Sequence, residues 1–205
     1  DVLARLKRIQ NYNVKFLTGT DEHGLKIQRE AEKNNKNPQE FCDDISLKFR
    51  NLSKTLNLTN DDFIRTTEKR HHKAVKEIWN RLVSSNDIYL SKYSGWYSVS
   101  DEAFYSDEEI DTKDNFKVSK ISGSKVEWVE EESFFFKLSS WQKKLLEFYE
   151  SNPDFILPKS RKNEVVEFVK SGLKDLSVSR TSFSWGIPVP KNSKHVIFVW
   201  LDALP

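Results

Sequence analysis

The chain has 205 residues and carries 33 Lys and Arg against 31 Asp and Glu, so its formal net charge is only +2 at pH 7. This balance excludes a polycation, and any contact with nucleic acid would therefore have to be local. Aromatic residues make up 13% of the chain and can fill a core, while no apolar run approaches the ~20 residues that span a bilayer, so no membrane partner is expected.

The first part of the chain alternates strand-like and helix-like patterns. Residues 14–17 predict a buried parallel strand, because they are mainly apolar without strict alternation. Asn37 and Pro38 are typical of a helix start, with Asn37 as the cap and Pro38 in the first helical position. The apolar residues that follow at helical spacing are Phe41, Ile45, Phe49, Leu52 and Leu56.

A second strand and another helix follow. Residues 63–65 predict the strand, and Thr66 or Thr67 can cap the next helix. That helix has apolar residues at helical spacing over 75–82. The alternation of strand and helix predicts a parallel α/β layer over residues 1–85.

Beyond Asn86 the pattern changes. Short strands rich in aromatic residues are predicted over 89–90, 93–99 and 103–105. The polar stretch 106–125 shows little periodicity, and residues 126–138 predict another extended run.

Two amphipathic helices are predicted next, over 141–149 and 164–169, with Gly172 ending the second. Residues 196–201 predict a strongly apolar, buried strand. The whole pattern predicts an α/β layer interrupted by an inserted α+β module.

The most informative stretch is residues 16–24, FLTGTDEHG, which lead from the first strand into a helical stretch. It places Asp21, Glu22 and His23 at the carboxyl end of the strand, where open parallel sheets bind ligands. On local grounds Asp21 can also cap the next helix. A metal or acid–base cluster of all three is disfavoured, because neighbouring strand residues point to opposite faces.

This stretch resembles the TGTDEHG signature of the methionyl-tRNA synthetases, a class I aminoacyl-tRNA synthetase family. Further stretches resemble that family in its own order: 63–68, 95–105, 175–180, 185–188 and 199–204. The resemblance implies a Rossmann-like parallel catalytic layer over 1–85 and 176–205, interrupted by a connective-peptide insertion over 86–175.

The resemblance also implies where methionine binds. Asp21 would hold the α-ammonium group, a role that suits a carboxylate in a partly dry site. Trp200 and Ala203 would line the side-chain pocket, since an indole face packs well against a thioether. Leu204 would form a neighbouring wall. On local grounds alone, an ordinary core residue of an apolar strand is the favoured interpretation of Trp200.

Two further residues belong to the site by resemblance. Arg180 would meet the substrate carboxylate or the nucleotide anion, although an arginine at this place can also be a solvated surface residue. His23 is expected to form a site wall, with a partner that the sequence does not disclose. For the basic cluster 70–73, a solvated helix surface is favoured over contact with tRNA phosphates.

The insertion departs from many relatives. Where they carry a zinc knuckle that begins Cys-x-x-Cys, this chain has Ser98 and Asp101, and no second pair of ligands is available. Structural zinc needs about four thiolate or imidazole ligands, so no zinc is expected. The aromatic residues expected to hold the module instead are Tyr93, Trp96, Phe104, Trp128, Phe134 and Phe136.

The resemblance implies part of a methionine–tRNA ligase, which activates methionine with ATP, with Mg²⁺ expected, and transfers it to tRNA(Met). The HIGH and KMSKS motifs that contact ATP are expected before Asp1 and after Pro205, so this central piece alone is expected to be inactive. Alternatives are a non-catalytic synthetase-like module that binds tRNA or methionine, and a plain α/β scaffold. The single Cys42 fits a reducing compartment or simply a cysteine-poor protein. The expected location is the bacterial cytoplasm, with the mitochondrial matrix as the alternative.

Overall fold

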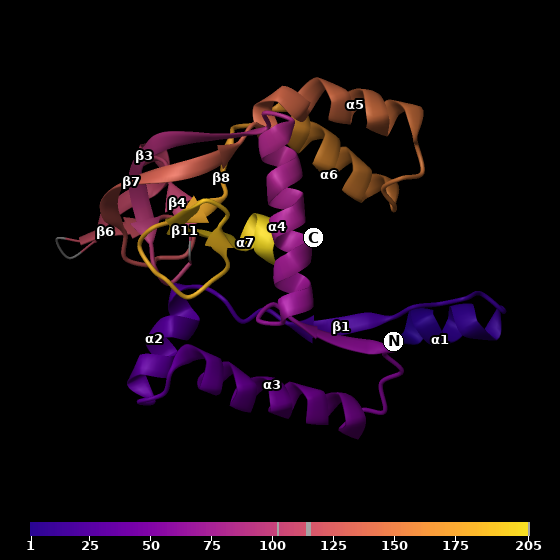
Figure 1. Cartoon of the computed structure of the whole chain (residues 1–205). Helices are drawn as coiled ribbons and strands as arrows, with labels where there is room; N and C mark the ends of the chain where they lie inside the picture. Colours follow the sequence, from indigo (N-terminus) through magenta and orange to yellow (C-terminus); the bar gives the residue numbers. More distant parts are fainter. Residues whose placement is uncertain (102, 114–115, 205) are drawn as a thin grey trace.

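The computed structural model describes residues 1–101, 103–113 and 116–204. The first part of the chain contains α1 (Val2–Ile9), β1 (Leu17–Thr20), α2 (Leu25–Lys33), α3 (Pro38–Thr55), β2 (Asp62–Arg65) and α4 (Lys69–Ser84). Helix α4 leads from the β1–β2 sheet to the rest of the molecule (Figure 1). No helix in these described ranges is both long and apolar enough to cross a membrane.

The strands β1 and β2 pair in parallel, which confirms the predicted parallel layer. However, the first strand begins at Leu17 and not at residue 14. The reason lies at Phe16, whose backbone N–H donates to the Asp61 carboxylate over 2.6 Å instead of joining the strand ladder.

Helix α3 begins as the sequence indicates, because the Asn37 side chain accepts a hydrogen bond from the Glu40 N–H over 2.9 Å. Its apolar face is nevertheless largely exposed, with Phe49 at 51% and Leu56 at 60%. The predicted threonine cap of α4 is wrong: Glu68 precedes the helix without any side-chain cap, because the threonine hydroxyls before it bond to Glu22 instead.

Gly19 allows β1 and β2 to approach closely. A Cβ added there would lie 2.0 Å from the Ile64 carbonyl oxygen, and backbone atoms of a paired strand cannot move aside cheaply. We therefore expect Gly19→Ala to lower the free energy of unfolding by about 3 kcal/mol, measured by urea unfolding. Gly186→Ala is the matched control, because its Cβ would meet only the Val196 side chain, at 3.2 Å. Equal losses in the two variants would contradict this explanation.

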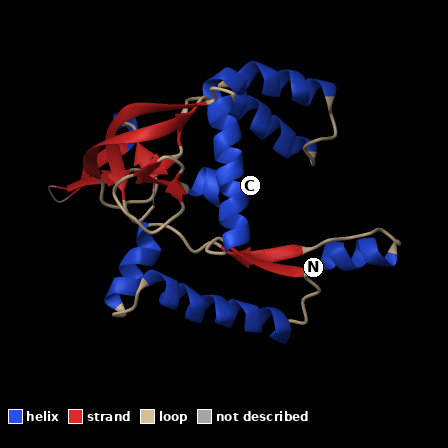
Figure 2. Cartoon of the chain, in the orientation of Figure 1, coloured by secondary structure: helices blue, strands red, loops and turns tan. Residues whose placement is uncertain are grey.

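The middle of the chain forms an antiparallel sheet in the order β4-β3-β7-β8. The strands of this sheet are among those drawn in red in Figure 2. Its strands are β3 (Ile88–Ser98), β4 (Ala103–Tyr105), β7 (Glu127–Phe136) and β8 (Leu176–Ser177). The two strands predicted over 89–99 are one strand, because β3 pairs with β7 without interruption. The polar stretch that showed little periodicity contains the short helix η1 (Asp107–Glu109) and the strand pair β5 (Ile110–Lys113) and β6 (Phe116–Ser119).

Aromatic side chains pack in pairs across this sheet. The ring centroids of Trp96 and Trp128 lie 5.3 Å apart, and those of Tyr97 and Phe104 lie 4.7 Å apart. The Tyr93 side chain, also expected in this packing, lies outside the described part of the structure. The predicted helical pair is present as η2 (Leu138–Trp141), α5 (Gln142–Ser151) and α6 (Lys159–Lys170). The boundaries placed after residues 85 and 175 stay predictions.

The last part of the chain forms a small antiparallel sheet and a single helical turn. The sheet has the order β10-β11-β9, with β9 (Ser179–Arg180), β10 (Pro188–Val189) and β11 (Asn192–Ile197). The strand predicted over 196–201 is therefore only partly correct. It ends at Ile197, and α7 (Val199–Asp202) follows, with the Asp202 and Ala203 N–H groups donating to the carbonyls of Phe198 and Val199.

The main core joins α4 to the strands around it. Its buried members are Val75, Trp79, Ile88, Val178, Ile187, Val189 and Ile197. Because two of them lie on α4 and four lie after residue 175, the core fixes the last part of the chain against that helix. Helix α7 consequently lies beside α4 (Figure 1).

Candidate functional site

The loop after β1 meets the end of β11 and the start of α7. A small hollow of about 30 Å³ lies between them. Its lining residues are Asp21, His23, Gly24, Phe183, Ile197, Phe198, Val199 and Asp202. The two segments are nearly 180 residues apart in the chain, and the fold brings them into one place.

Asp21 is exposed at the carboxyl end of β1. It does not cap the following helix, because α2 begins after Gly24 and has no side-chain cap. On the other side of the hollow, Trp200 is 44% exposed and Leu204 is 71% exposed, while Ala203 is half-buried. The structure therefore brings α7 close to Asp21. However, the expected pocket residues Trp200, Ala203 and Leu204 do not themselves line the hollow.

A buried polar network joins the two sides. His23 Nδ1 lies 2.6 Å from one carboxylate oxygen of Asp202, and His71 Nε2 lies 3.1 Å from the other. Asp202 is only 2% exposed. The His23 ring also packs against His72 and Trp185, each with ring centroids 5.6 Å away. His23 thus has the partner that the sequence did not disclose.

The network sets the charge of its members. Burial alone would raise the pKa of Asp202, but hydrogen bonds from His23 and His71 outweigh it and hold the pKa below its ordinary value. The hydrogen bond to Asp202 raises the pKa of His71. Burial and the neighbouring His23 lower the pKa of His72. The arrangement favours an ionised Asp202 beside a protonated His71.

Sequence reasoning missed His71 and Asp202. The cluster 70–73 was interpreted as a solvated surface, which is wrong for His71, a residue only 9% exposed. Its spacing held a usable signal, because His71 lies four residues before Val75 and eight before Trp79, on the same buried face of α4. Arg70 is exposed and pairs with Asp62 and Glu68, as a surface residue does.

Glu22 has a structural role. Its carboxylate accepts hydrogen bonds from Thr20, Arg65 Nε and Thr67 over 2.6 to 2.8 Å. Burial alone would raise its pKa, but the bonds from Arg65 and the two threonines lower it. Glu22 therefore ties β1 to β2. Within the described ranges, no group of three or more His, Cys, Asp and Glu is arranged to hold a metal ion.

Arg180 is only 3% exposed and does not line the hollow itself. Its guanidinium stacks 3.7 Å from the ring centroid of Phe198, which lines the hollow. Its Nη1 donates to Ser177 Oγ over 2.6 Å and to the Ser179 carbonyl over 2.8 Å. The Phe198 ring thus lies between the Arg180 guanidinium and the hollow that Asp21 lines.

The two positions that replace the zinc knuckle lie in a hydroxyl–carboxylate cluster. The Asp101 carboxylate accepts hydrogen bonds from Tyr105 over 2.8 Å, from Ser122 over 2.5 Å and from Ser124. Ser98 Oγ donates to Ser124 Oγ over 3.0 Å. Hydroxyls and one carboxylate do not match the thiolate and imidazole ligands of structural zinc. The sequence predicts that aromatic packing supports this module. The structure adds the hydroxyl–carboxylate cluster around Asp101 as a second support.

Asp101→Ala should destabilise this module. Bonds from the serine hydroxyls and Tyr105 hold the pKa of Asp101 well below its usual range, so the variant loses charge-assisted hydrogen bonds worth about 1.5–3 kcal/mol each before solvent screening. We expect a lower thermal midpoint, whereas a chelator should leave the midpoint of the parent unchanged. A chelator-sensitive midpoint would contradict the metal-free interpretation. Asp111→Asn, on the exposed strand β5, is the control.

Comparisons with known proteins place these features in a family. The family model described as tRNA synthetases class I (M) matches residues 1–115 and 113–205. The chain is 58% identical over 204 residues to the methionine–tRNA ligase of Rickettsia conorii (strain ATCC VR-613 / Malish 7), and 53% identical over 204 residues to that of Brucella suis biovar 1 (strain 1330). These matches cover 100% of this chain but 39% and 40% of the relatives, so the chain spans about two fifths of their length.

Solved structures agree. The crystal structure of Mycobacterium tuberculosis methionyl-tRNA synthetase bound by methionyl-adenylate superposes with a TM-score of 0.93 at 48% identity, over 98% of this chain and 40% of that one. The free-state structure of the same enzyme gives a TM-score of 0.77 at 46% identity, over 98% of this chain and 38% of that one. The match confirms the predicted fold class, a Rossmann-like parallel layer interrupted by an insertion.

Proposed function

We propose that this chain, which belongs to the methionyl-tRNA synthetase family of class I enzymes, supplies the amino-acid side of a methionine–tRNA ligase site. The supporting observation is the hollow where the Asp21 loop and α7 meet, bridged by His23 and Asp202. The reaction would join the methionine carboxylate to the α-phosphate of ATP, release pyrophosphate, and pass the methionyl group to tRNA(Met). Mg²⁺ would accompany the ATP and neutralise phosphate charge.

Asp21 would hold the α-ammonium of methionine, a role supported by its exposed carboxylate at the edge of the hollow. The hollow of about 30 Å³ holds roughly one water molecule. Methionine binding must therefore displace a wall. The wall proposed to move is α7, a single helical turn whose Trp200 indole is already 44% exposed and free to pack on the thioether. Ala203 and Leu204 would complete this side.

Arg180 would attract the methionine carboxylate or the anionic phosphates of the nucleotide. Its position behind Phe198 supports a through-space attraction of the substrate anion, and direct contact would require that ring to move. We propose that the ATP contacts come from HIGH and KMSKS motifs of the full-length enzyme that lie outside residues 1–205. Rate enhancement would rest on orientation of the two substrates and on stabilised charge at the α-phosphate. We place the enzyme in the bacterial cytoplasm, with the mitochondrial matrix as the alternative.

The test is methionine-dependent exchange of pyrophosphate into ATP by a full-length synthetase carrying this chain. Exchange is expected with methionine and not with leucine or isoleucine, and residues 1–205 alone are expected to show none. Exchange that depends on another amino acid, or no exchange by the full-length protein, would refute the proposed function.

A further inference from the structure

The loop between β9 and β10, residues 181–187, carries a tryptophan between two buried anchors. Phe183 packs in an apolar cluster with Phe198, and Ile187 is fully buried in the main core. Trp185 lies midway between these two residues. Because the chain is anchored two residues before and two residues after it, the backbone of Trp185 is held in place.

Trp185 makes two hydrogen bonds to the Asp21 loop, residues 21–24. Its indole Nε1 donates to the Glu22 carbonyl over 2.6 Å, and its own carbonyl accepts from the Gly24 N–H over 3.1 Å. The indole also packs edge-on against the His23 ring. The bonded carbonyl and N–H belong to the two peptide groups that flank His23, so Trp185 fixes the backbone on both sides of that residue.

The peptide group just before these two is fixed as well. The Glu22 N–H donates to Thr66 Oγ1 over 2.9 Å, and this N–H belongs to the peptide group that follows Asp21. The loop ends at Gly24, whose φ of 107° is a conformation that few residues other than glycine adopt. The direction of the exposed Asp21 carboxylate is therefore set by a backbone that neighbouring residues hold, as precise binding of a small ligand requires.

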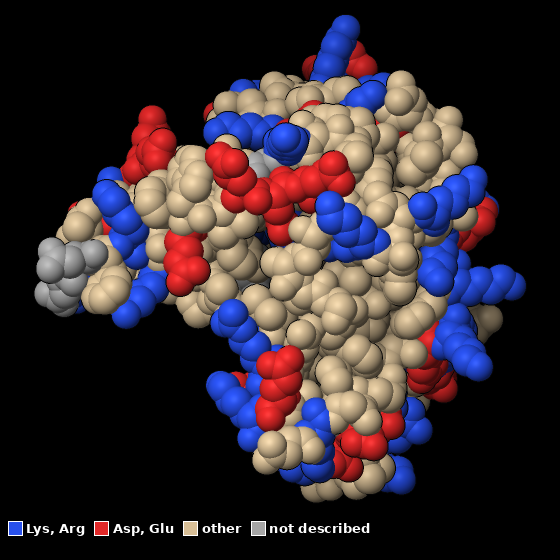
Figure 3. Space-filling model, turned by 60° about the vertical axis from the view of Figure 1, so that its left-hand side comes forward, with Lys and Arg blue, Asp and Glu red and all other residues tan. Residues whose placement is uncertain are grey.

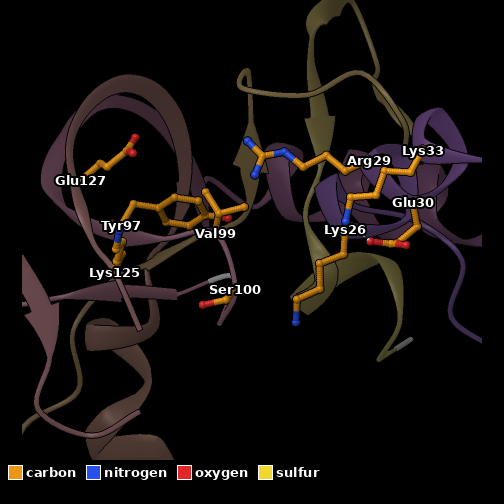
Figure 4. A pocket seen from close by; sticks show the side chains of 9 residues that line it. All are labelled: Lys26, Arg29, Glu30, Lys33, Tyr97, Val99, Ser100, Lys125 and Glu127. Atoms are coloured by element: carbon orange, nitrogen blue, oxygen red, sulfur yellow. Dashed lines mark hydrogen bonds and ion pairs between the residues drawn. The ribbon is translucent and has the colours of Figure 1, made fainter. Parts of the chain in front are cut away.

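Helix α2 supports the same arrangement from a different side than the one that faces the insertion. The α2 residues that line the hollow of Figure 4 are Lys26, Arg29, Glu30 and Lys33. Gln28 lies between these positions and therefore on another side of the helix. Its side-chain oxygen accepts hydrogen bonds from the backbone N–H groups of Ser184 and Trp185, over 3.3 and 3.2 Å. Gln28 thus holds the segment from which Trp185 reaches the Asp21 loop.

We propose that Trp185 is a positioning residue for methionine: it holds the Asp21 loop so that the Asp21 carboxylate meets the α-ammonium group. The proposal rests on the proposed function. The bond from His23 to Asp202 joins the same loop to α7, the wall proposed to move when methionine binds. Trp185 does not lie on α7, so its two bonds keep the Asp21 side in place while that wall moves.

The test measures methionine-dependent pyrophosphate exchange by the full-length synthetase. Trp185→Phe keeps an aromatic ring and removes the indole N–H, which leaves the buried Glu22 carbonyl without its shortest bond. We expect KM for methionine to rise about five- to tenfold, with kcat and KM for ATP little changed, because the contact with the ammonium group is the same before and during the reaction. Trp141→Phe is the matched control. Trp141 is also half-buried, but its Nε1 has no hydrogen-bond partner among the described residues.

Gln28→Leu is a second, independent variant, which leaves the indole intact and removes the bonds to residues 184 and 185. It should raise KM for methionine in the same direction by a smaller factor. Neither variant changes a charge, and the face in Figure 3 carries basic and acidic side chains close together. The expected change in KM therefore does not come from long-range attraction of the substrate.

A lowered thermal midpoint of Trp185→Phe with unchanged KM for methionine would assign a purely structural role to Trp185 and overturn the proposal. So would equal increases of KM for methionine and for ATP. If the parent shows no methionine-dependent pyrophosphate exchange, the proposed function fails. Amide hydrogen exchange then still tests the support of the loop: residues 22–24 should exchange faster in Trp185→Phe and not in Trp141→Phe. Unchanged rates at these residues would overturn the proposal independently of any activity.

Discussion

Replacing Asp21 by Asn is expected to lower kcat/KM for methionine in pyrophosphate exchange by about 10- to 100-fold. An amide has nearly the shape of the carboxylate but cannot offer its negative charge to the α-ammonium group. Hydrogen bonds to charged groups contribute about 1.5–3 kcal/mol, and 1.36 kcal/mol corresponds to a factor of ten. The loss should appear mainly in KM for methionine, with KM for ATP little changed.

Stability separates this role from a structural one. Because Asp21 is exposed and does not cap α2, Asp21→Asn should lower the thermal midpoint far less than Asp202→Ala does. Glu32→Gln, an exposed change on α2, is the matched control for the loss of one negative charge nearby. A lowered midpoint together with unchanged methionine kinetics would show that Asp21 supports the loop and does not bind substrate.

Local sequence patterns predicted those elements near the site for which a single pattern, such as a helix cap or an apolar spacing, was decisive. Asn37 before Pro38 located the start of α3, and apolar spacing located α4. Residues 196–201 show the limit of such rules. An apolar run fits a buried strand and a buried helical turn equally well, and only the packing of the chain against α4 decides that it changes from β11 to α7 after Phe198.

The polar part of the site was harder to predict, because its partners are distant in the chain. His71 and Asp202 are 131 residues apart, and each has an ordinary local explanation. The same holds for the cluster around Asp101, whose serine partners lie more than twenty residues away in a stretch with little periodicity. Hydrogen bonds between distant side chains leave no period in the sequence, whereas a helix face or a cap does.

Replacing Asp202 by Ala is expected to lower the free energy of unfolding by about 3–5 kcal/mol, because it leaves two buried histidines without their acceptor. It should also change KM for methionine, because the bond between Asp202 and His23 joins α7, the wall proposed to move, to the Asp21 loop. Asp202→Asn keeps the shape of the side chain and should lower the free energy of unfolding by less than Asp202→Ala. Asp175→Asn is the matched control: Asp175 accepts bonds from Tyr89 and Ser139 outside the site, so it should affect stability only.

The pH dependence of stability tests the same network. Asp202 raises the pKa of His71 above its ordinary value near 6.5, so the pair stabilises the fold below that pH and the contribution is lost as pH rises through the folded-state pKa. On the acid side, the lowered pKa of Asp202 means that its contribution is present above pH 3.8 and is lost below. His23, His72 and Asp21 also face this network. Burial and His23 lower the pKa of His72, which changes stability in the opposite direction, so the contribution of the Asp202–His71 pair is taken from the difference between the parent and Asp202→Asn. Relative to Asp202→Asn, the parent protein should therefore lose stability from about pH 6.5 upward, as measured by urea unfolding of both proteins at each pH. Parallel curves for the two proteins would mean that Asp202 and His71 do not form a charged pair, and that α7 is held to the site by packing alone.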